Sequence, residues 1–244
     1  MQQTNNSQNK LNFKHGLKDG LPIGLGYLSV SFAFGVQASL VGVPVFMSVF
    51  ISMTNLTSAG QLAGLTIIAS LGTILEIILS QIVINARYFL MSITVSQKLE
   101  KEFTTAQRFL ASAFITDEIF AVAAAKPCLI NKRYFYGLVV LPYFGWALGT
   151  LIGASAGDIL PANISSALGI ALYAMFIAII IPPSINIKGV LPVVVLAAGF
   201  SCSFYFLPFL SSVSSGIAII ISAIISASII ALLYPIKHKE SDEQ

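Results

Sequence analysis

Two adjacent carboxylates interrupt an apolar stretch of this chain. The residues from Phe109 to Ala125 are apolar except around Thr116-Asp117-Glu118. Carboxylates in such surroundings are costly, and an ionisable residue inside a membrane is a candidate functional site, able to meet a cationic group or carry a proton. Neighbouring side chains on a helix diverge by about 100°. We therefore expect at most one of the two acids to face any given partner.

A guanidinium lies in another apolar stretch. Arg87 has ten uncharged residues on each side, and Asn85 precedes it by two positions. An unpaired charge there is expensive, so Arg87 should meet an acid or a substrate carboxylate. We predict that Asp117 or Glu118 pairs with it across a helical bundle. The pair is either a fixed salt bridge or one that a zwitterionic substrate or protonation opens, and the sequence leaves both open.

Polar and small residues also cluster in a third place, at Asn55, Thr57, Ser58 and Gln61. Such side chains compete for backbone hydrogen bonds and weaken a helix. One interpretation is a broken helix that binds substrate near the middle of a membrane. The other is a cluster of hydrogen bonds between helices.

Three further residues have plainer interpretations. Glu76 shows no obvious local partner, and we expect it at a surface loop after Gly72. Tyr143 and Trp146 lie one turn apart, where they either line an apolar pocket or belong to an interfacial aromatic belt.

The elements that must position these residues are membrane helices. The 244 residues are 56% hydrophobic and only 9% charged, and Gly20–Leu75 holds no Asp, Glu, Lys or Arg. Soluble domains carry about 25% charged residues, and roughly 20 apolar residues span a bilayer as a helix. The runs are too long and too uniformly apolar for a transmembrane β-barrel.

We therefore predict an all-α integral membrane protein, a polytopic bundle with about eight apolar segments in a single transmembrane domain over residues 13–236. Polar tails are expected at 1–12, disordered, and at 237–244, cytoplasmic. The predicted segments are Gly20–Val41, Val45–Ser70, Leu71–Val95, Phe109–Ala125, Tyr134–Ala156, Ser165–Ile181, Val190–Leu207 and Val213–Tyr234.

The distribution of Lys and Arg predicts both termini inside the cell. With eight crossings, nine cations fall on one side: Lys10, Lys14, Lys18, Lys126, Lys132, Arg133, Lys188, Lys237 and Lys239. Lys98, Lys101 and Arg108 then fall on the other side, a modest violation. A re-entrant second or fourth segment repairs it and gives six or seven crossings.

Glycines repeat every four residues in two segments, at Gly16, Gly20 and Gly24 and again from Gly145 to Gly157. On a helix they form a stripe that lets another backbone approach closely. The stripes serve either tight packing or a surface that slides during transport.

Several classes of function find no support in the sequence. There is no Walker loop and no His-Glu-x-x-His motif, and neither Cys128 nor Cys202 shows metal-ligand spacing. The net charge of +3 does not indicate nucleic acid as a partner. We expect no catalysis, cofactor or metal.

Three elements occur in a fixed order along the chain: Asp19-Gly20-Leu21-Pro22 running to Phe32-Ala33-Phe34-Gly35, then Asn85-x-Arg87, then Thr116-Asp117-Glu118-x-Phe120-Ala121. Together they resemble the AzlC-type branched-chain amino acid permease family, from about Phe13 to Tyr234. The resemblance implies an amino acid exporter in the bacterial cytoplasmic membrane, coupled to an ion gradient and working with a small AzlD-type membrane subunit. The motif positions that it implies are Asn85, Arg87, Asp117, Glu118 and Gln61.

The chain departs from the family pattern at two motif positions. Ser58 replaces a glycine before Gln61, and Tyr88 stands where a histidine is common. Without that histidine, proton coupling needs Asp117, Glu118 or Glu76.

The leading hypothesis is a secondary exporter of branched-chain or similar apolar amino acids. Arg87 meets the substrate carboxylate, Asp117 or Glu118 meets the ammonium or the coupling proton, and Asn55, Gln61, Asn85 and Thr116 complete the candidate site. The alternatives are a membrane channel and a membrane assembly subunit that transports nothing.

Overall fold

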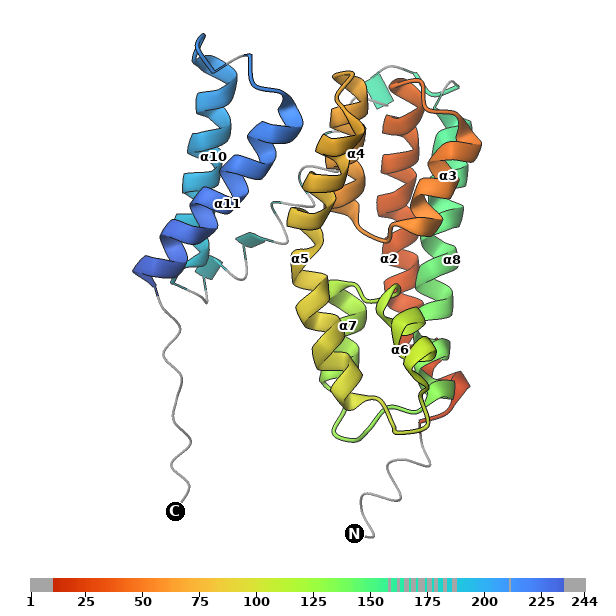
Figure 1. Cartoon of the computed structure of the whole chain (residues 1–244). Coiled ribbons are helices and arrows are strands. Elements are labelled where there is room, and N and C mark those ends of the chain that lie inside the picture. The colour runs from red at the N-terminus through yellow and green to blue at the C-terminus, as the bar shows by residue number, and fades with distance from the viewer. Residues whose placement is uncertain are drawn as a thin grey trace. The chain divides into compact units, whose positions relative to one another are not determined.

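The computed structural model describes residues 11–157, 159–161, 163–164, 167, 170, 174, 177, 180–181, 184–185, 188–210 and 212–234. Most of the predicted sixth segment, Ser165–Ile181, lies outside the described residues, as do both predicted tails except Leu11 and Asn12. The described part is helical and holds no strand. The helices are α2 (Phe13–Leu40), α3 (Val45–Thr54), α4 (Ser58–Ala69), α5 (Ile74–Lys98), α6 (Thr105–Ser112), α7 (Asp117–Ala124), α8 (Lys132–Ala156), α10 (Val190–Phe206) and α11 (Ser215–Leu233) (Figure 1).

The all-α prediction is confirmed for the described residues. Among them α2, α5, α8 and α11 are long and apolar enough to cross a membrane, and α3, α4 and α10 are shorter apolar helices. The number of crossings and the side on which each terminus lies stay predictions.

The chain divides into two compact units, residues 1–65 with 84–172 and residues 66–83 with 173–244. The single domain predicted over 13–236 also stays a prediction. In the second unit α10 packs on α11, and Gly216 of α11 lies against Glu76 and Ile67. The candidate site residues all lie in the first unit.

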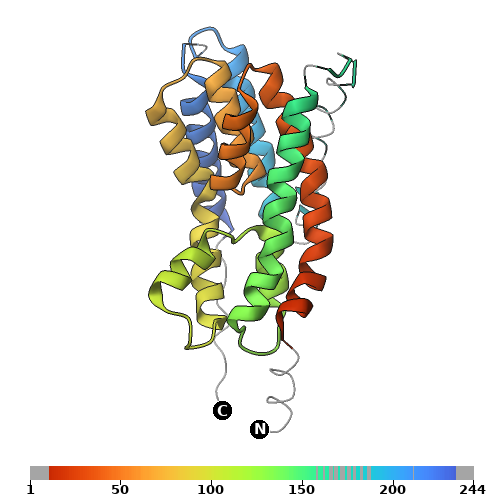
Figure 2. The same ribbon diagram turned by 90° about the vertical axis from the view of Figure 1, so that its right-hand side faces the viewer.

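The first unit is built on close contact between α2 and α8, which lie side by side along their length (Figure 2). A Cβ on Gly24 would lie 2.8 Å from the Leu141 carbonyl oxygen, and one on Gly145 would lie 2.5 Å from that of Gly24. Gly16 meets Tyr134 near the start of both helices, whereas Gly35 meets Thr150 further along both. The two helices therefore run parallel, and the glycine stripes lie in a tightly packed contact, the first of the two interpretations; movement along them during transport stays a prediction.

The predicted second segment consists of two short helices, and the chain reverses direction between them. α3 and α4 are separated at residues 55–57. Leu65 of α4 packs against Phe34 and Ala38 near the end of α2, and Val43, just before α3, packs there too. Because Leu65, in the second half of α4, packs with Val43 at the entry to α3, the segment forms a hairpin whose tip is the break (Figures 1 and 2).

The predicted fourth segment is a second hairpin, with its break at residues 113–116 between α6 and α7. Arg108 of α6 donates hydrogen bonds to the Ser96 and Glu100 carbonyl oxygens at the end of α5. Lys98, also at the end of α5, donates to the Ala124 and Lys126 carbonyl oxygens after α7. The base of this hairpin is therefore fixed to the end of α5.

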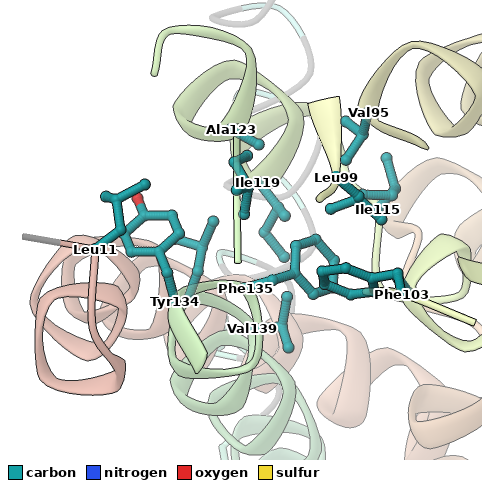
Figure 3. Packing of buried hydrophobic residues seen from close by; sticks show 13 residues of the cluster. Leu11, Val95, Leu99, Phe103, Ile115, Ile119, Ala123, Tyr134, Phe135 and Val139 are labelled. Atoms are coloured by element: carbon teal, nitrogen blue, oxygen red, sulfur yellow. The ribbon is translucent and has the colours of Figure 1, made fainter. Parts of the chain in front are cut away.

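A buried apolar cluster holds this hairpin against α8 (Figure 3). Ile115 and Ile119 from the hairpin, Val95 from α5 and Phe135 from α8 are members of it. Ile119 and Phe135 are fully buried. The cluster sets the position of α7, whose first turn carries Asp117 and Glu118.

The hairpins gather positive charge at one end of the unit. Lys126 pairs with Asp19 at 2.7 Å, and Leu99 forms a bridge with Ile130, so the start of α2, the end of α5 and the start of α8 lie together. Lys98, Lys101 and Arg108 thus lie at the same end as Lys14, Lys18, Lys126, Lys132 and Arg133. Eight crossings would place Lys98, Lys101 and Arg108 at the end opposite Lys14, Lys18 and Lys126, and this expectation is wrong. The re-entrant alternative places all of them at the same end, as observed. The positive-inside rule predicts that this end is cytoplasmic.

The glycine contact gives a matched pair of substitutions on α2. Gly24→Ala forces a Cβ against the Leu141 carbonyl and should cost about 1–3 kcal/mol. Gly26→Ala, two residues along, meets nothing within 4 Å and should leave stability unchanged or raise it by up to about 1 kcal/mol. Thermal unfolding in detergent measures both, and equal midpoints would contradict the packing described.

Candidate functional site

The tips of the two hairpins expose backbone groups that side chains must satisfy. At the first tip, the Asn55 carbonyl accepts a hydrogen bond from Gln61 Nε2 at 2.9 Å, and the Thr57 hydroxyl accepts one from the Gly60 N–H. At the second tip, the Thr116 hydroxyl accepts from the Ile119 N–H at 3.3 Å as the N-cap of α7. Of the two interpretations of Asn55–Gln61, the broken helix is present, and hydrogen bonds from Gln61 to Ser52 and between Ser52 and Thr150 form the cluster between helices as well.

Arg87 pairs with Asp117. Its Nη2 lies 2.8 Å from Asp117 Oδ2, so the cross-bundle pair predicted from the cost of an unpaired charge is formed, and Asp117 supplies the acid. The side chains are 48% and 38% exposed. Charges inside a membrane face protein or a water-filled cavity. The pair is therefore partly accessible rather than fully buried.

Tyr88 connects this pair to the other hairpin tip. Its hydroxyl accepts a hydrogen bond from Arg87 Nη2 at 3.1 Å and lies 3.5 Å from Asp117 Oδ2. The Arg87 guanidinium also lies over the Tyr88 ring, 4.9 Å from its centroid. The side chain of Thr57 interacts with the same tyrosine. Both breaks thus meet at one residue of α5.

Glu118 turns away from Arg87 and meets α2 instead. The Tyr27 hydroxyl lies 2.5 Å from both Glu118 Oε2 and Thr116 Oγ1. The divergence expected for adjacent helical residues is therefore observed, with Asp117 facing a cation and Glu118 facing a hydroxyl. The Tyr27 ring is buried and packs edge-on against Trp146, with centroids 5.0 Å apart.

Gln61 forms a second polar cluster. Besides the Asn55 carbonyl, its Nε2 donates to Ser52 Oγ at 3.1 Å, and the Ser52 and Thr150 hydroxyls share a hydrogen bond of 2.7 Å. Gln61 is 2% exposed, and its Oε1 has no hydrogen-bond partner. Thr150 lies one turn from Trp146 on α8, and the Trp146 N–H is likewise buried without a partner. An open acceptor and an open donor are the groups that a polar ligand or water can satisfy.

The structure brings together Arg87, Asp117, Thr116 and Glu118 through two tyrosines, and it places Gln61 and Asn55 in the neighbouring cluster. Asn85 is half-buried on α5. It lies two residues before Arg87, so its side chain leaves the helix in a different direction.

Sequence reasoning missed Tyr27, Ser52 and Thr150 as members of the site. An isolated tyrosine or serine in an apolar helix carries no distinctive signal. Trp146 is 3% exposed, so the interfacial belt is wrong for it. Tyr143 donates to the Met53 carbonyl at 3.2 Å, just before the first hairpin tip.

Glu76 requires a correction. It lies beside the loop after Gly72, as predicted, but it is buried at 9% exposure and has a local partner. Its carboxylate accepts from the Thr73 N–H at 3.1 Å, and the Thr73 hydroxyl accepts from the Glu76 N–H, which is a capping box at the start of α5. The Thr-x-x-Glu spacing was a readable signal for this role.

Comparison with known proteins identifies the family. A sequence model of the AzlC protein family matches residues 22–160, which include both hairpins and Arg87. The chain belongs to the AzlC family. No solved structure matches it.

Two relatives of this AzlC protein are membrane proteins. One, from Archaeoglobus fulgidus, is called an uncharacterized membrane protein and is 33% identical over 72% of this chain and 77% of its own length. The other is the inner membrane protein YgaZ of Escherichia coli, 30% identical over 69% of this chain and 72% of its own length. Family and relatives indicate a membrane protein with a role related to transport.

The Gln61 cluster should stabilise the first hairpin of this AzlC protein. Gln61→Met keeps the length of the side chain but leaves the Asn55 carbonyl without its donor, which should cost about 1–3 kcal/mol. Thr54→Ala removes only an exposed hydroxyl bonded to its own helix and should change stability by less than about 0.5 kcal/mol. Thermal unfolding in detergent compares the two, and a loss as small in Gln61→Met would show that Gln61 does not hold the hairpin.

Proposed function

We propose that this protein is a secondary transporter that exports branched-chain or similar apolar amino acids across the bacterial cytoplasmic membrane. We propose further that it is the large subunit of a two-component permease with a small AzlD-type membrane subunit. The observation that carries the proposal is the half-exposed Arg87–Asp117 pair, which lies where two broken helices meet. Discontinuous helices of this kind often form substrate sites in secondary transporters.

The pair has the chemistry to bind an amino acid. A guanidinium presents paired N–H donors that match a carboxylate, so Arg87 suits the carboxylate of a zwitterion. Asp117 suits its ammonium group. When a zwitterion enters between them, one ion pair is replaced by two, and neither protein charge is left unpaired. This matters because a charge left without a partner inside a membrane is costly.

An apolar side chain on the substrate needs an apolar wall. The Tyr88 ring, 4.9 Å from the Arg87 guanidinium, supplies an apolar surface beside the pair. The proposed cycle moves the substrate without chemical conversion, and it uses no cofactor.

Export of a panel of labelled amino acids tests the proposal. Cells that lack endogenous exporters are loaded with labelled amino acids, with and without a co-expressed small partner subunit. We expect saturable efflux of leucine, isoleucine or valine, dependent on the partner. A channel would instead give conductance without saturation. No efflux in either arrangement, with folded protein in the membrane, would contradict the proposal.

Reversing the ion pair separates transport from assembly. Arg87→Asp alone places like charges together and should lower the folded yield several-fold. Combining Arg87→Asp with Asp117→Arg should restore the yield but leave efflux reduced by at least tenfold, because the cation then lies on α7 and the acid on α5. The yield of folded protein after detergent extraction and the rate of amino acid efflux are measured on the same membranes.

The Asp19–Lys126 pair, 2.7 Å apart at the predicted cytoplasmic end, is the matched control for this exchange. Exchanging its two charges should restore both yield and efflux. If the reversed Arg87–Asp117 pair also exports at the wild-type rate, the pair is purely structural and an assembly subunit is the better interpretation.

A further inference from the structure

The three acids in the apolar segments have different kinds of partner. Asp117 faces the Arg87 guanidinium at 2.8 Å. Glu76 accepts a hydrogen bond from the backbone of its own helix cap. Glu118 meets the Tyr27 hydroxyl, a neutral group that can both donate and accept. Of the three carboxylates, Glu118 is therefore the one whose observed partner can serve its charged and its neutral form equally well.

Tyr27 is built into a position between two acceptors. Its single hydroxyl lies 2.5 Å from Glu118 Oε2 and 2.5 Å from Thr116 Oγ1, yet it has one proton to donate. Its ring cannot move readily, because it is buried against Trp146. Rotation of the O–H bond alone is enough to change the acceptor.

We propose that Glu118 carries the proton that couples transport to the ion gradient, and that Tyr27 is the positioning residue that relays its protonation to α7. This inference rests on the proposed function and adds its coupling group. With Glu118 ionised, the Thr116 hydroxyl donates to Tyr27 and Tyr27 donates to Glu118. With Glu118 protonated, its O–H donates to Tyr27 and Tyr27 donates to Thr116. One proton is gained at Glu118, and the chain of hydrogen bonds reverses.

The reversal reaches the substrate pair through the helix cap. Thr116 Oγ1 already accepts from the Ile119 N–H as the N-cap of α7, so a donor from Tyr27 occupies its second lone pair and turns the Thr116 O–H away from Tyr27 to another acceptor. Asp117 follows directly in the first turn of the helix. Protonation of Glu118 therefore acts on the turn that aims Asp117 at Arg87.

Charge balance favours the same assignment. The titratable and charged groups around Glu118 are Tyr27 on α2, Arg87 and Tyr88 on α5, and Asp117 on α7, while α8 contributes the uncharged Trp146. With both acids ionised the cluster carries one net negative charge, and with Glu118 protonated it is neutral. A zwitterion adds no net charge, so the loaded cluster is neutral only in the protonated state. A cluster without net charge has the lowest desolvation cost in the hydrocarbon region of a membrane.

The test separates exchange from coupled transport in vesicles that contain the purified protein with its small partner subunit. Wild-type protein should exchange labelled leucine for unlabelled leucine, and it should accumulate leucine when a pH gradient is imposed. In Glu118→Gln the ratio of gradient-driven accumulation to exchange should fall at least tenfold below that of the wild-type protein, because an amide cannot take up the coupling proton. Asp117→Asn, the matched amide substitution next door, should lose both activities.

A binding measurement covers the case in which Glu118→Gln folds poorly. When leucine is added to wild-type protein in weakly buffered detergent solution, the protein should bind or release protons, and a pH indicator measures this change. Tyr27→Phe should reduce this proton signal by at least threefold while leucine still binds. Wild-type leucine transport without any proton movement overturns this inference alone, as does a Glu118→Gln protein that still couples. Wild-type protein that transports no amino acid overturns the proposed function together with it.

Discussion

Hydrocarbon offers no water to an exposed peptide group or an unpaired charge, and this constraint organises the first unit. Each break in a membrane helix needs side chains that replace the lost backbone bonds. Gln61 does this at residues 55–57 and Thr116 does it at residues 113–116. The two breaks also carry Gln61, Thr116 and Asp117 of the candidate site, whereas Arg87 and Tyr88 come from the unbroken α5. The site therefore combines polar groups at the two breaks with an ion-pair partner on a continuous helix.

The unit combines a rigid pair of helices with a hairpin that is fixed at one end. Backbone contact along the glycine stripes leaves α2 and α8 little room to move relative to each other. α7 is held differently. The Ala124 carbonyl at its end accepts a hydrogen bond from Lys98, and Ile119 is packed in the apolar cluster, whereas the Asp117 and Glu118 side chains of its first turn are held by the ion pair and the Tyr27 hydroxyl. A substrate or a proton can exchange contacts of the second kind, so the first turn of α7 is the part of the site that can respond to them.

The length of the apolar runs predicted the helices, and the cost of an unpaired charge predicted that Arg87 meets an acid. The small and polar residues near Asn55 gave a broken helix as one of two interpretations. These features depend on local composition or on one large energy term. The folding of two segments into hairpins was open from sequence, since an interrupted apolar run is compatible with a crossing. Tyr27 was missed because its contact with Glu118 spans 91 residues, and no periodic pattern marks such a pair. The partner of Glu76 was missed although Thr73 supplied a local capping signal.

The tyrosine that follows Arg87 bears on which group can change charge. A tyrosine hydroxyl can accept from the guanidinium and approach the Asp117 carboxylate while it stays neutral. It thus supports the ion pair and leaves any change of charge to the carboxyl groups. Asp117 is neutralised by Arg87, and protonating it would leave a guanidinium unpaired. Protonating Glu118 leaves no charge unpaired and keeps every hydrogen bond of the Tyr27 chain. The site therefore has one carboxyl that can gain or lose a proton without breaking the ion pair beside it.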